Sequence, residues 1–238
     1  MAESTTLGQN YEKVLKALEK ACQRAGRRRE DITLVAVSKF HSASDIRSIV
    51  EAGQLDFGEN YLQEAEEKKY LLADCKDIRW HMIGHVQSRK APAVAGNFTL
   101  LHSLDSIKLA NSLEKALIAK GVDQDVLIEV NIAGEAQKAG ISQEELQDLV
   151  EHVESTCPHI KLKGLMCLPP VFNSGDAARP FFARLYELRE IIGRSLGRSL
   201  PHLSMGMSGD FASAIEEGAN IVRIGTDIFG PRPIKKRN

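Results

Sequence analysis

The residue with the clearest potential for chemistry is Lys39, which directly follows residues 32–38, an apolar run rich in β-branched side chains. A lysine at the end of a buried strand lies beside apolar walls, and these disfavour its charged form. A neutral amine can attack an aldehyde, so the position favours a Schiff-base lysine. The alternative is a lysine whose stem lies along apolar surface while its ammonium reaches solvent.

A second group of candidates, near the other end of the chain, is suited to bind an anion. Ser204, Ser208 and Thr226 offer hydroxyls, and the glycines among them, including Gly225, leave backbone N–H groups uncovered. The phosphate-loop pattern G-x-x-x-x-G-K-[ST] is absent from the sequence. The alternative is a pair of glycine-assisted turns with ordinary helix capping by Ser208 or Asp210.

Arg223 lies two residues before Gly225. Side chains two apart on a strand point to the same side, so Arg223 is expected on the side of the sheet that Gly225 faces. A buried arginine is costly unless it is paired. Two interpretations remain open: a structural ion pair, with Glu129 as a candidate partner, or a contact with the ring nitrogen of a ligand.

The elements that must position these residues alternate between strand and helix patterns. The expected strands cover residues 32–38, 55–58, 79–83, 99–103, 126–131, 162–166, 202–205 and 221–224, and the expected helices cover residues 11–25, 44–52, 61–72, 88–95, 106–120, 142–155, 176–196 and 211–217. Strict alternation predicts a parallel sheet with right-handed crossovers. Eight repeats favour a closed (β/α)8 TIM-type barrel over an open doubly wound sheet. No low-complexity linker divides the chain, so residues 1–238 are interpreted as one domain.

The barrel brings the candidates together. Reactive groups of such barrels lie at the carboxyl ends of the strands, and the loops after strands seven and eight often bind phosphate. Lys39 follows the first expected strand, Ser204 to Ser208 end and follow the seventh, and Thr226 follows the eighth. We therefore expect an amine and an anion cradle at one barrel mouth.

Composition excludes several function classes. With 31 basic and 32 acidic residues the net charge is −1, which argues against a nucleic-acid or membrane surface. The basic runs at residues 27–29 and 235–237 are short and are interpreted as solvated. The first ten residues are polar, no apolar run is long enough to span a bilayer, and the four cysteines fall in no C-x-x-C or zinc spacing. We expect a cytosolic protein with reduced thiols, monomeric or weakly dimeric.

Two weaker patterns are interpreted as structural. His81 and His85 are four residues apart, which suits a metal on a helix, but this pair straddles an expected strand end. No metal site is therefore expected. Glu59, beside Asn60, is interpreted as a cap or loop contact.

A series of short segments, in chain order, carries a resemblance to a known family. They are Val-Ser-Lys at 37–39, Phe-Gly-Glu-Asn-Tyr at 57–61, Trp-His-Met-Ile-Gly at 80–84 with Gln-Ser at 87–88, Val-Asn-Ile at 130–132 with Lys138 and Gly140, Gly-Leu-Met at 164–166, Leu-Ser-Met-Gly-Met-Ser at 203–208, and Val-Arg-Ile-Gly-Thr at 222–226 with Ile-Phe-Gly at 228–230. Together they resemble the pyridoxal phosphate homeostasis proteins. That family has a barrel like the N-terminal domain of alanine racemase, without that enzyme's second domain.

The resemblance implies a cofactor, pyridoxal 5′-phosphate, and assigns residues to it. They are Lys39 as the Schiff-base lysine, Asn60 near the ring, Arg223 at the pyridine nitrogen, and Ser204, Ser208, Gly225 and Thr226 at the phosphate. Two residues depart from the family pattern: Phe40 stands where threonine usually follows the lysine, and Arg89 where asparagine is usual. Both are expected outside the cofactor contacts.

An arginine at the pyridine nitrogen argues against an enzyme. It keeps its proton, so the ring is a poorer electron sink than transamination requires. A racemase would need a second acid/base group. In alanine racemase that group is a tyrosine from the missing domain, and the four tyrosines here (Tyr11, Tyr61, Tyr70 and Tyr186) fall in expected helices.

The prediction is thus a carrier that holds pyridoxal phosphate and supplies it to apoenzymes or buffers it. The alternatives are a small pyridoxal-phosphate-dependent amino-acid racemase and a barrel that binds another phosphate ester.

Overall fold

The computed structural model describes residues 2–231 and contains eight parallel strands that close into a barrel. Each strand pairs with the next in the sequence, and β1 pairs with β8 to complete the ring. The strands are β1 Thr33–Val37, β2 Asp56–Glu59, β3 Arg79–Met82, β4 Leu100–Leu104, β5 Gln124–Val130, β6 Ile160–Cys167, β7 His202–Ser204 and β8 Ile221–Ile224. The predicted (β/α)8 barrel is confirmed.

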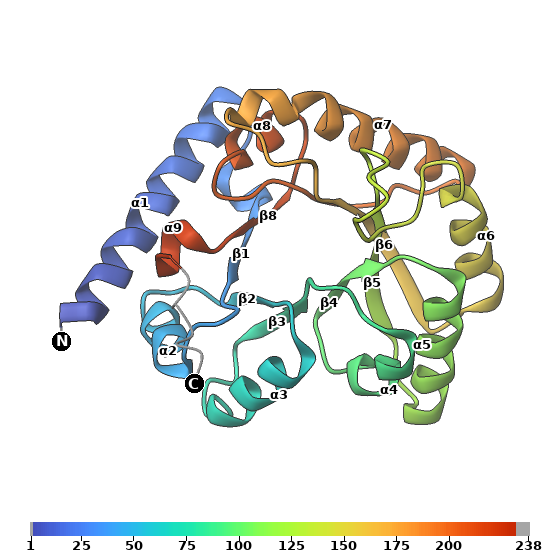
Figure 1. The fold of residues 1–238 in the computed structure, drawn as a ribbon, viewed down its shortest axis with the longest axis horizontal. Coiled ribbons are helices and arrows are strands. Elements are labelled where there is room, and N and C mark those ends of the chain that lie inside the picture. The colour runs from blue at the N-terminus through green and yellow to red at the C-terminus, as the bar shows by residue number, and fades with distance from the viewer. Residues whose placement is uncertain (1, 232–238) are drawn as a thin grey trace.

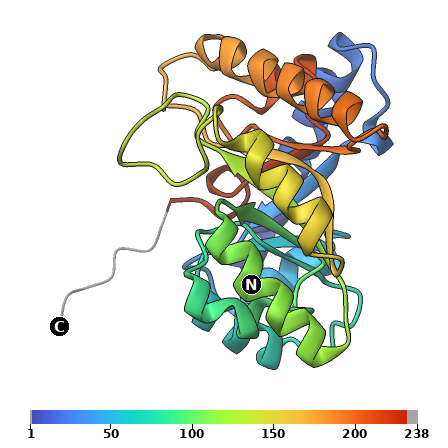
Figure 2. The same ribbon diagram turned by 90° about the vertical axis from the view of Figure 1, so that its right-hand side faces the viewer.

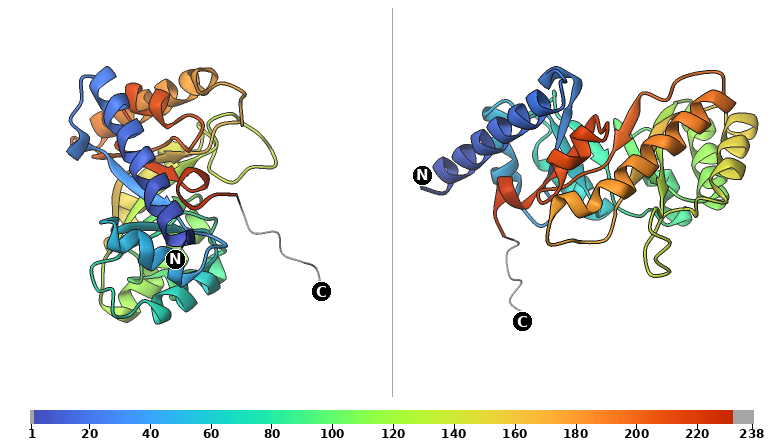
Figure 3. Two further views of the ribbon diagram at one scale, coloured as in Figure 1. Left: turned by 90° about the vertical axis from the view of Figure 1, so that its left-hand side faces the viewer. Right: turned by 90° about the horizontal axis from the view of Figure 1, so that it is seen from above.

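Helices surround the strands on the outside of the barrel (Figure 1). The α-helices are α1 Ala2–Arg24, α2 Ala43–Glu51, α3 Leu62–Leu71, α4 Ala91–Val94, α5 Ile107–Lys120, α6 Leu146–Thr156, α7 Arg179–Ser195, α8 Phe211–Glu216 and α9 Thr226–Phe229, and the 3-10 helices are η1 Arg29–Asp31, η2 Ser88–Lys90 and η3 Gly175–Ala178. The loop after β5 stands away from the barrel (Figure 2 and the right panel of Figure 3).

Several helix bounds differ from the sequence-based ones for local reasons. The single helix expected over residues 88–95 is instead η2 followed by α4, because Pro92 has no N–H to donate to the carbonyl of Ser88. The helix expected from residue 142 begins as α6 at Leu146. Ser142 caps the turn before it, since its hydroxyl accepts a hydrogen bond from the Glu145 N–H at 3.2 Å.

Two helices, α1 and α9, differ from what the spacing of apolar residues in the sequence predicts. The first helix was expected from residue 11, but α1 begins at Ala2, and Leu7 packs against the core. The α9 helix was not predicted at all. It has only four residues, which is too short to show a helical repeat.

The barrel wall separates two apolar cores. The larger one fills the space between strands and helices. The smaller one lies inside the barrel and consists of Val35, Leu100, Leu127, Met166 and Ile221. Because the inner apolar core is small, polar side chains occupy much of the remaining barrel interior.

Within residues 2–231, no helix is long and apolar enough to cross a membrane. Cys22, Cys75, Cys157 and Cys167 form no disulfide in the structure. The basic run at residues 235–237 lies outside the described residues.

Candidate functional site

A cleft of about 380 Å³ opens at the carboxyl ends of the strands. It is lined by all but one of the residues predicted to bind the cofactor: Lys39, Asn60, Ser208, Arg223, Gly225 and Thr226. Its apolar wall includes Val37, Ile83 and Leu168, and Lys138 also lines it. The amine from the first strand therefore shares one cavity with the residues that follow the last two strands.

Glycines allow the strand ends to approach closely enough to form this cleft. A Cβ on Gly84 would lie 2.2 Å from the carbonyl oxygen of Asn60, and a Cβ on Gly225 would lie 3.1 Å from the carbonyl oxygen of Val37. The side-chain oxygen Oδ1 of Asn60 is buried without a hydrogen-bond partner among the described residues. A buried acceptor of this kind calls for a donor.

Lys39 lies in a tight turn. The His41 N–H donates to the Ser38 carbonyl at 3.0 Å, which makes Lys39 the second residue of a four-residue turn. The third residue, Phe40, has a φ of 69°, the left-handed value typical of a type II turn. Glycine or asparagine usually occupies that position, so Phe40, which departs from the family pattern, adopts a costly conformation beside the key lysine.

Ser204 is the one predicted cofactor residue that the structure places elsewhere. Its side chain is fully buried inside the barrel, and its hydroxyl accepts a hydrogen bond from Arg223 Nη1 at 2.5 Å. A second contact, at 2.9 Å, joins it to His102 Nδ1. The hydroxyl of Ser204 therefore binds the guanidinium of Arg223 inside the barrel and does not line the cleft.

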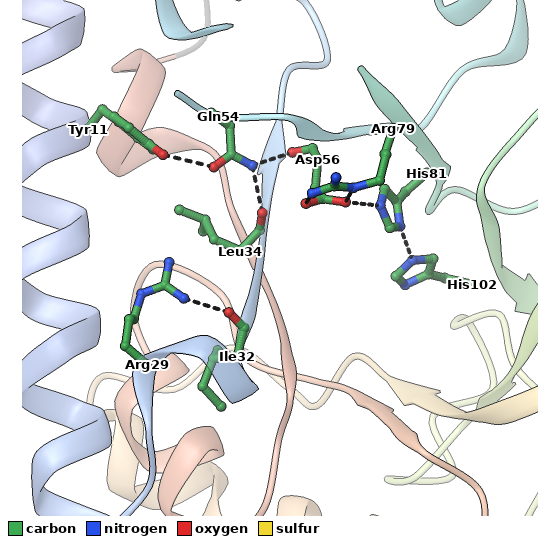
Figure 4. Close-up of polar contacts among 9 residues, drawn as sticks. All are labelled: Tyr11, Arg29, Ile32, Leu34, Gln54, Asp56, Arg79, His81 and His102. Atoms are coloured by element: carbon green, nitrogen blue, oxygen red, sulfur yellow. Dashed lines mark hydrogen bonds and ion pairs between the residues drawn. The ribbon is translucent and has the colours of Figure 1, made fainter. Parts of the chain in front are cut away.

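The contact with His102 belongs to a chain of polar side chains that crosses the barrel interior. His102 Nε2 lies 3.0 Å from His81 Nδ1, and His81 Nε2 lies 3.0 Å from Asp56 Oδ1. Asp56 also binds the guanidinium of Arg79, at 2.6 and 2.8 Å. Figure 4 shows the outer part of this chain, from Arg79 to His102. The chain was not predicted, because its members come from strands far apart in the sequence.

The hydrogen bonds of the chain have one consistent direction. Burial, together with the nearby guanidinium of Arg223, holds the pKa of His102 well below its ordinary value, so His102 is neutral and has one N–H. Arg223 can only donate to Ser204, and His102 Nδ1 is the one acceptor within reach of the Ser204 proton among the described residues, so we assign that proton to His102 Nδ1. His102 Nε2–H then donates to His81 Nδ1, and His81 Nε2–H donates to Asp56. Every group from Arg223 to Asp56 is thereby satisfied.

The two ends of the chain differ in charge, because Asp56 is paired with Arg79 whereas the hydrogen-bond partners of Arg223 are neutral. Burial alone would raise the pKa of Asp56, but hydrogen bonds from Arg79 and His81 lower it to about 2. Burial lowers the pKa of Arg223, although an arginine keeps its proton at neutral pH. The second donor group of Arg223, Nη2, binds the Cys167 carbonyl at 2.9 Å.

The ion pair considered between Arg223 and Glu129 is not found among the described residues, where the hydrogen-bond partners of Arg223 are neutral. Burial and the nearby Asp105 raise the pKa of Glu129 to about 7, so this carboxyl is easily protonated. The interpretation of Arg223 as a residue directed at a ligand is therefore favoured.

The remaining candidates have ordinary structural contacts. His81 and His85 do not share a partner, since His85 pairs with Asp105 at 2.9 Å at the rim. Glu59 was wrongly interpreted as a cap or loop contact. It is fully buried at the end of β2 and forms an ion pair with Lys68 at 2.7 Å.

Comparisons with known proteins agree with this geometry. Residues 14–233 match the family model of the alanine racemase N-terminal domain. The pyridoxal phosphate homeostasis protein of Aquifex aeolicus is 44% identical over 220 residues, which cover 92% of this chain and 96% of the relative. That of Pseudomonas aeruginosa is 42% identical and covers 96% of both chains. The chain belongs to the pyridoxal phosphate homeostasis protein family.

A similar protein of known structure extends the comparison. PipY of Synechococcus elongatus, solved with pyridoxal phosphate bound, is 31% identical with a TM-score of 0.76, covering 90% of this chain and 99% of PipY. Alanine racemase from Corynebacterium glutamicum is 16% identical with a TM-score of 0.71, which shows a shared fold alone. This member of the homeostasis protein family thus has the expected racemase-type barrel.

Proposed function

We propose that this chain binds pyridoxal 5′-phosphate reversibly as a Schiff base on Lys39 and serves as a carrier that supplies or buffers the cofactor. The observation that supports this most directly is the shared cleft, which brings Lys39, Arg223 and Thr226 together. The names of the relatives and the cofactor bound to PipY point the same way.

The residues of the cleft fit the parts of this cofactor. Its aldehyde would react with the amine of Lys39, and its phosphate would be held by hydroxyl and backbone N–H groups of Ser208, Gly225 and Thr226. Ser208 also hydrogen-bonds the carboxylate of Asp227, whose pKa is raised by burial. The unpaired Oδ1 of Asn60 offers an acceptor in the cleft.

Arg223 favours a carrier over an enzyme. Bound pyridoxal phosphate is a weaker electron sink when its ring nitrogen is unprotonated, and an arginine donates a hydrogen bond there without transferring its proton. The described residues that line the cleft include no tyrosine. Tyr61 instead precedes α3 and lines a neighbouring cavity of about 180 Å³, with its ring 5.3 Å from that of Phe40.

The attachment to Lys39 is tested by borohydride reduction of the protein loaded with cofactor. The visible absorption band is expected to become fixed, and peptide mapping is expected to place the label on Lys39. Lys138 lines the same cleft, so a label on Lys138 would contradict the assignment. In Lys39→Ala the fixed label is expected to disappear.

The carrier role is tested with the loaded protein. Mixed with an apoenzyme that needs pyridoxal phosphate, it is expected to restore that enzyme's activity. With D- or L-alanine it is expected to give no racemisation beyond that of free cofactor, and robust racemisation would favour the alternative. We further expect a cytosolic protein, monomeric or weakly dimeric, whose partners are such apoenzymes.

A further inference from the structure

Behind the turn that carries Lys39 lies a group of three charged side chains, two of them buried, that the proposed function does not use. It consists of Lys68 and Glu64 of α3 and Glu59 of β2, which we call the α3 cluster. Lys68 is only 4% exposed and Glu59 is fully buried, between the barrel wall and the helix. Burying charges is expensive, so a group like this calls for an explanation.

The three N–H donors of the Lys68 ammonium all have acceptors. Lys68 Nζ lies 2.6 Å from the carbonyl oxygen of Ser38, 2.7 Å from Glu59 Oε1 and 2.7 Å from Glu64 Oε1. The Ser38 hydroxyl donates to the same Glu59 oxygen at 2.6 Å. The cluster therefore binds Ser38, the residue before Lys39, at both the carbonyl and the hydroxyl of Ser38.

The cluster also forms a hydrogen bond with Phe40, the residue after Lys39. The Phe40 N–H donates to Glu64 Oε1 at 2.5 Å, the oxygen that also accepts from Lys68. Phe40 is the residue with the positive φ of 69°. A phenylalanine persists in that conformation only where its surroundings enforce it, and the hydrogen bond to Glu64 is such a constraint.

We propose that the α3 cluster is a positioning device that fixes both peptide groups flanking Lys39 and so presents its amine to the cleft. The proposal rests on the proposed role of Lys39. The Ser38 hydroxyl donates to Glu59 beneath α3, while Val37 and Lys39 on either side of it line the cleft. The cluster thus acts from behind the strand without touching the cofactor.

The decisive variant is Glu64→Ala, which removes the acceptor of the Phe40 N–H but leaves Glu59 to pair with Lys68. Misplacing a reacting group slows its reaction steeply, so bond formation between apoprotein and added pyridoxal phosphate, followed by borohydride trapping, is expected to slow on the order of tenfold. Glu67→Ala is the matched control, because Glu67 is an exposed residue of the same helix. Its rate is expected to equal that of the wild type.

A rescue separates positioning from mere anchoring of α3. Glycine adopts a positive φ without strain, so the double variant Phe40→Gly/Glu64→Ala is expected to recover to within about twofold of Phe40→Gly alone. If the cluster only anchors the helix, Glu64→Ala would lower the melting temperature but leave the trapping rate unchanged. That result would overturn the proposal, and so would a slowed rate that Phe40→Gly fails to restore.

Hydrogen exchange of the Phe40 amide gives a readout that needs no cofactor. In the apoprotein it is expected to be faster in Glu64→Ala than in the wild type or in Glu67→Ala. If the wild type forms no trappable bond at all, the proposed function fails, and the exchange alone decides whether the cluster holds the turn. If the wild type forms the bond and Glu64→Ala forms it equally fast, only the positioning proposal fails.

Discussion

The two sides of the cleft are supported in different ways. Behind Lys39, the α3 cluster of Lys68, Glu59 and Glu64 uses full charges in direct contact. Next to Arg223, a chain through Ser204 and His102 uses neutral groups, and the carboxylate at its far end, Asp56, is paired with Arg79. Ions outside the barrel wall thus support Lys39, and neutral dipoles inside the barrel support Arg223.

The difference follows from the room available to each group. Between a strand and a helix, one ammonium reaches three acceptors at once, and this compensates its burial. Inside the barrel, side chains from several strands fill the space, and a second ion beside Arg223 would need its own partners. A chain of neutral hydrogen bonds, each polarising the next, connects Arg223 to Asp56 without burying another charge midway.

The largest loss of unfolding free energy is expected for Lys68→Met. It leaves the buried carboxylate of Glu59 without its cation, and Glu59 Oε2 has no hydrogen-bond partner among the described residues. Removing one partner of a buried pair costs about 3–5 kcal/mol, measurable as the free energy of unfolding in urea. Lys76→Met, at an exposed lysine, is the control, with an expected change within about 0.5 kcal/mol.

A second substitution checks the cause of that loss. Adding Glu59→Gln to Lys68→Met removes the stranded charge and is expected to restore part of the stability. If Lys68→Met alone costs less than about 1 kcal/mol, below the cost of a stranded buried charge, then ions do not support this side of the cleft.

A smaller loss is expected for His102→Leu on the other side. It removes the acceptor of the Ser204 proton and the donor to His81 Nδ1, and two neutral buried hydrogen bonds lost in this way cost about 2 kcal/mol in the same urea measurement. His152→Leu, at a histidine bonded only to surface groups, serves as the control. A loss larger than that of Lys68→Met would reverse the comparison between the two sides.

The barrel was predictable because each strand is a short apolar run between helical segments. The bounds of β8, Ile221–Ile224, agree with those expected. The cleft followed from the fold, since the carboxyl ends of parallel strands meet at one mouth. Lys39 and Thr226 were therefore placed together from opposite ends of the sequence.

The supports of the site were not predictable in the same way. The direction of the Ser204 hydroxyl is decided by His102 and Arg223 on other strands, and no local pattern in the sequence records such contacts. The α3 cluster did leave a signal. Lys68 follows Leu62 and Ala65 at intervals of three on the buried face of α3, where a lysine calls for a buried partner.

The smallest expected effect is on the pH dependence of the free energy of unfolding, and it depends on His102. The His102 ring is hydrogen-bonded to His81 and Ser204 and lies near Arg223 and His202. Its folded pKa lies well below the unfolded value of about 6.5, so the unfolded chain binds a proton more readily, and stability falls as the pH drops below about 6.5.

Between pH 7 and pH 5.5 the wild type should lose about 1 kcal/mol of unfolding free energy more than His102→Leu, which has no imidazole to titrate at position 102. Glu129, whose pKa is raised to about 7, acts in the opposite direction over the same range, but it is present in both proteins and cancels in their difference. Equal pH dependence in the two proteins would mean that His102 accepts a proton in the folded state, and the neutral chain beneath Arg223 would then be wrong.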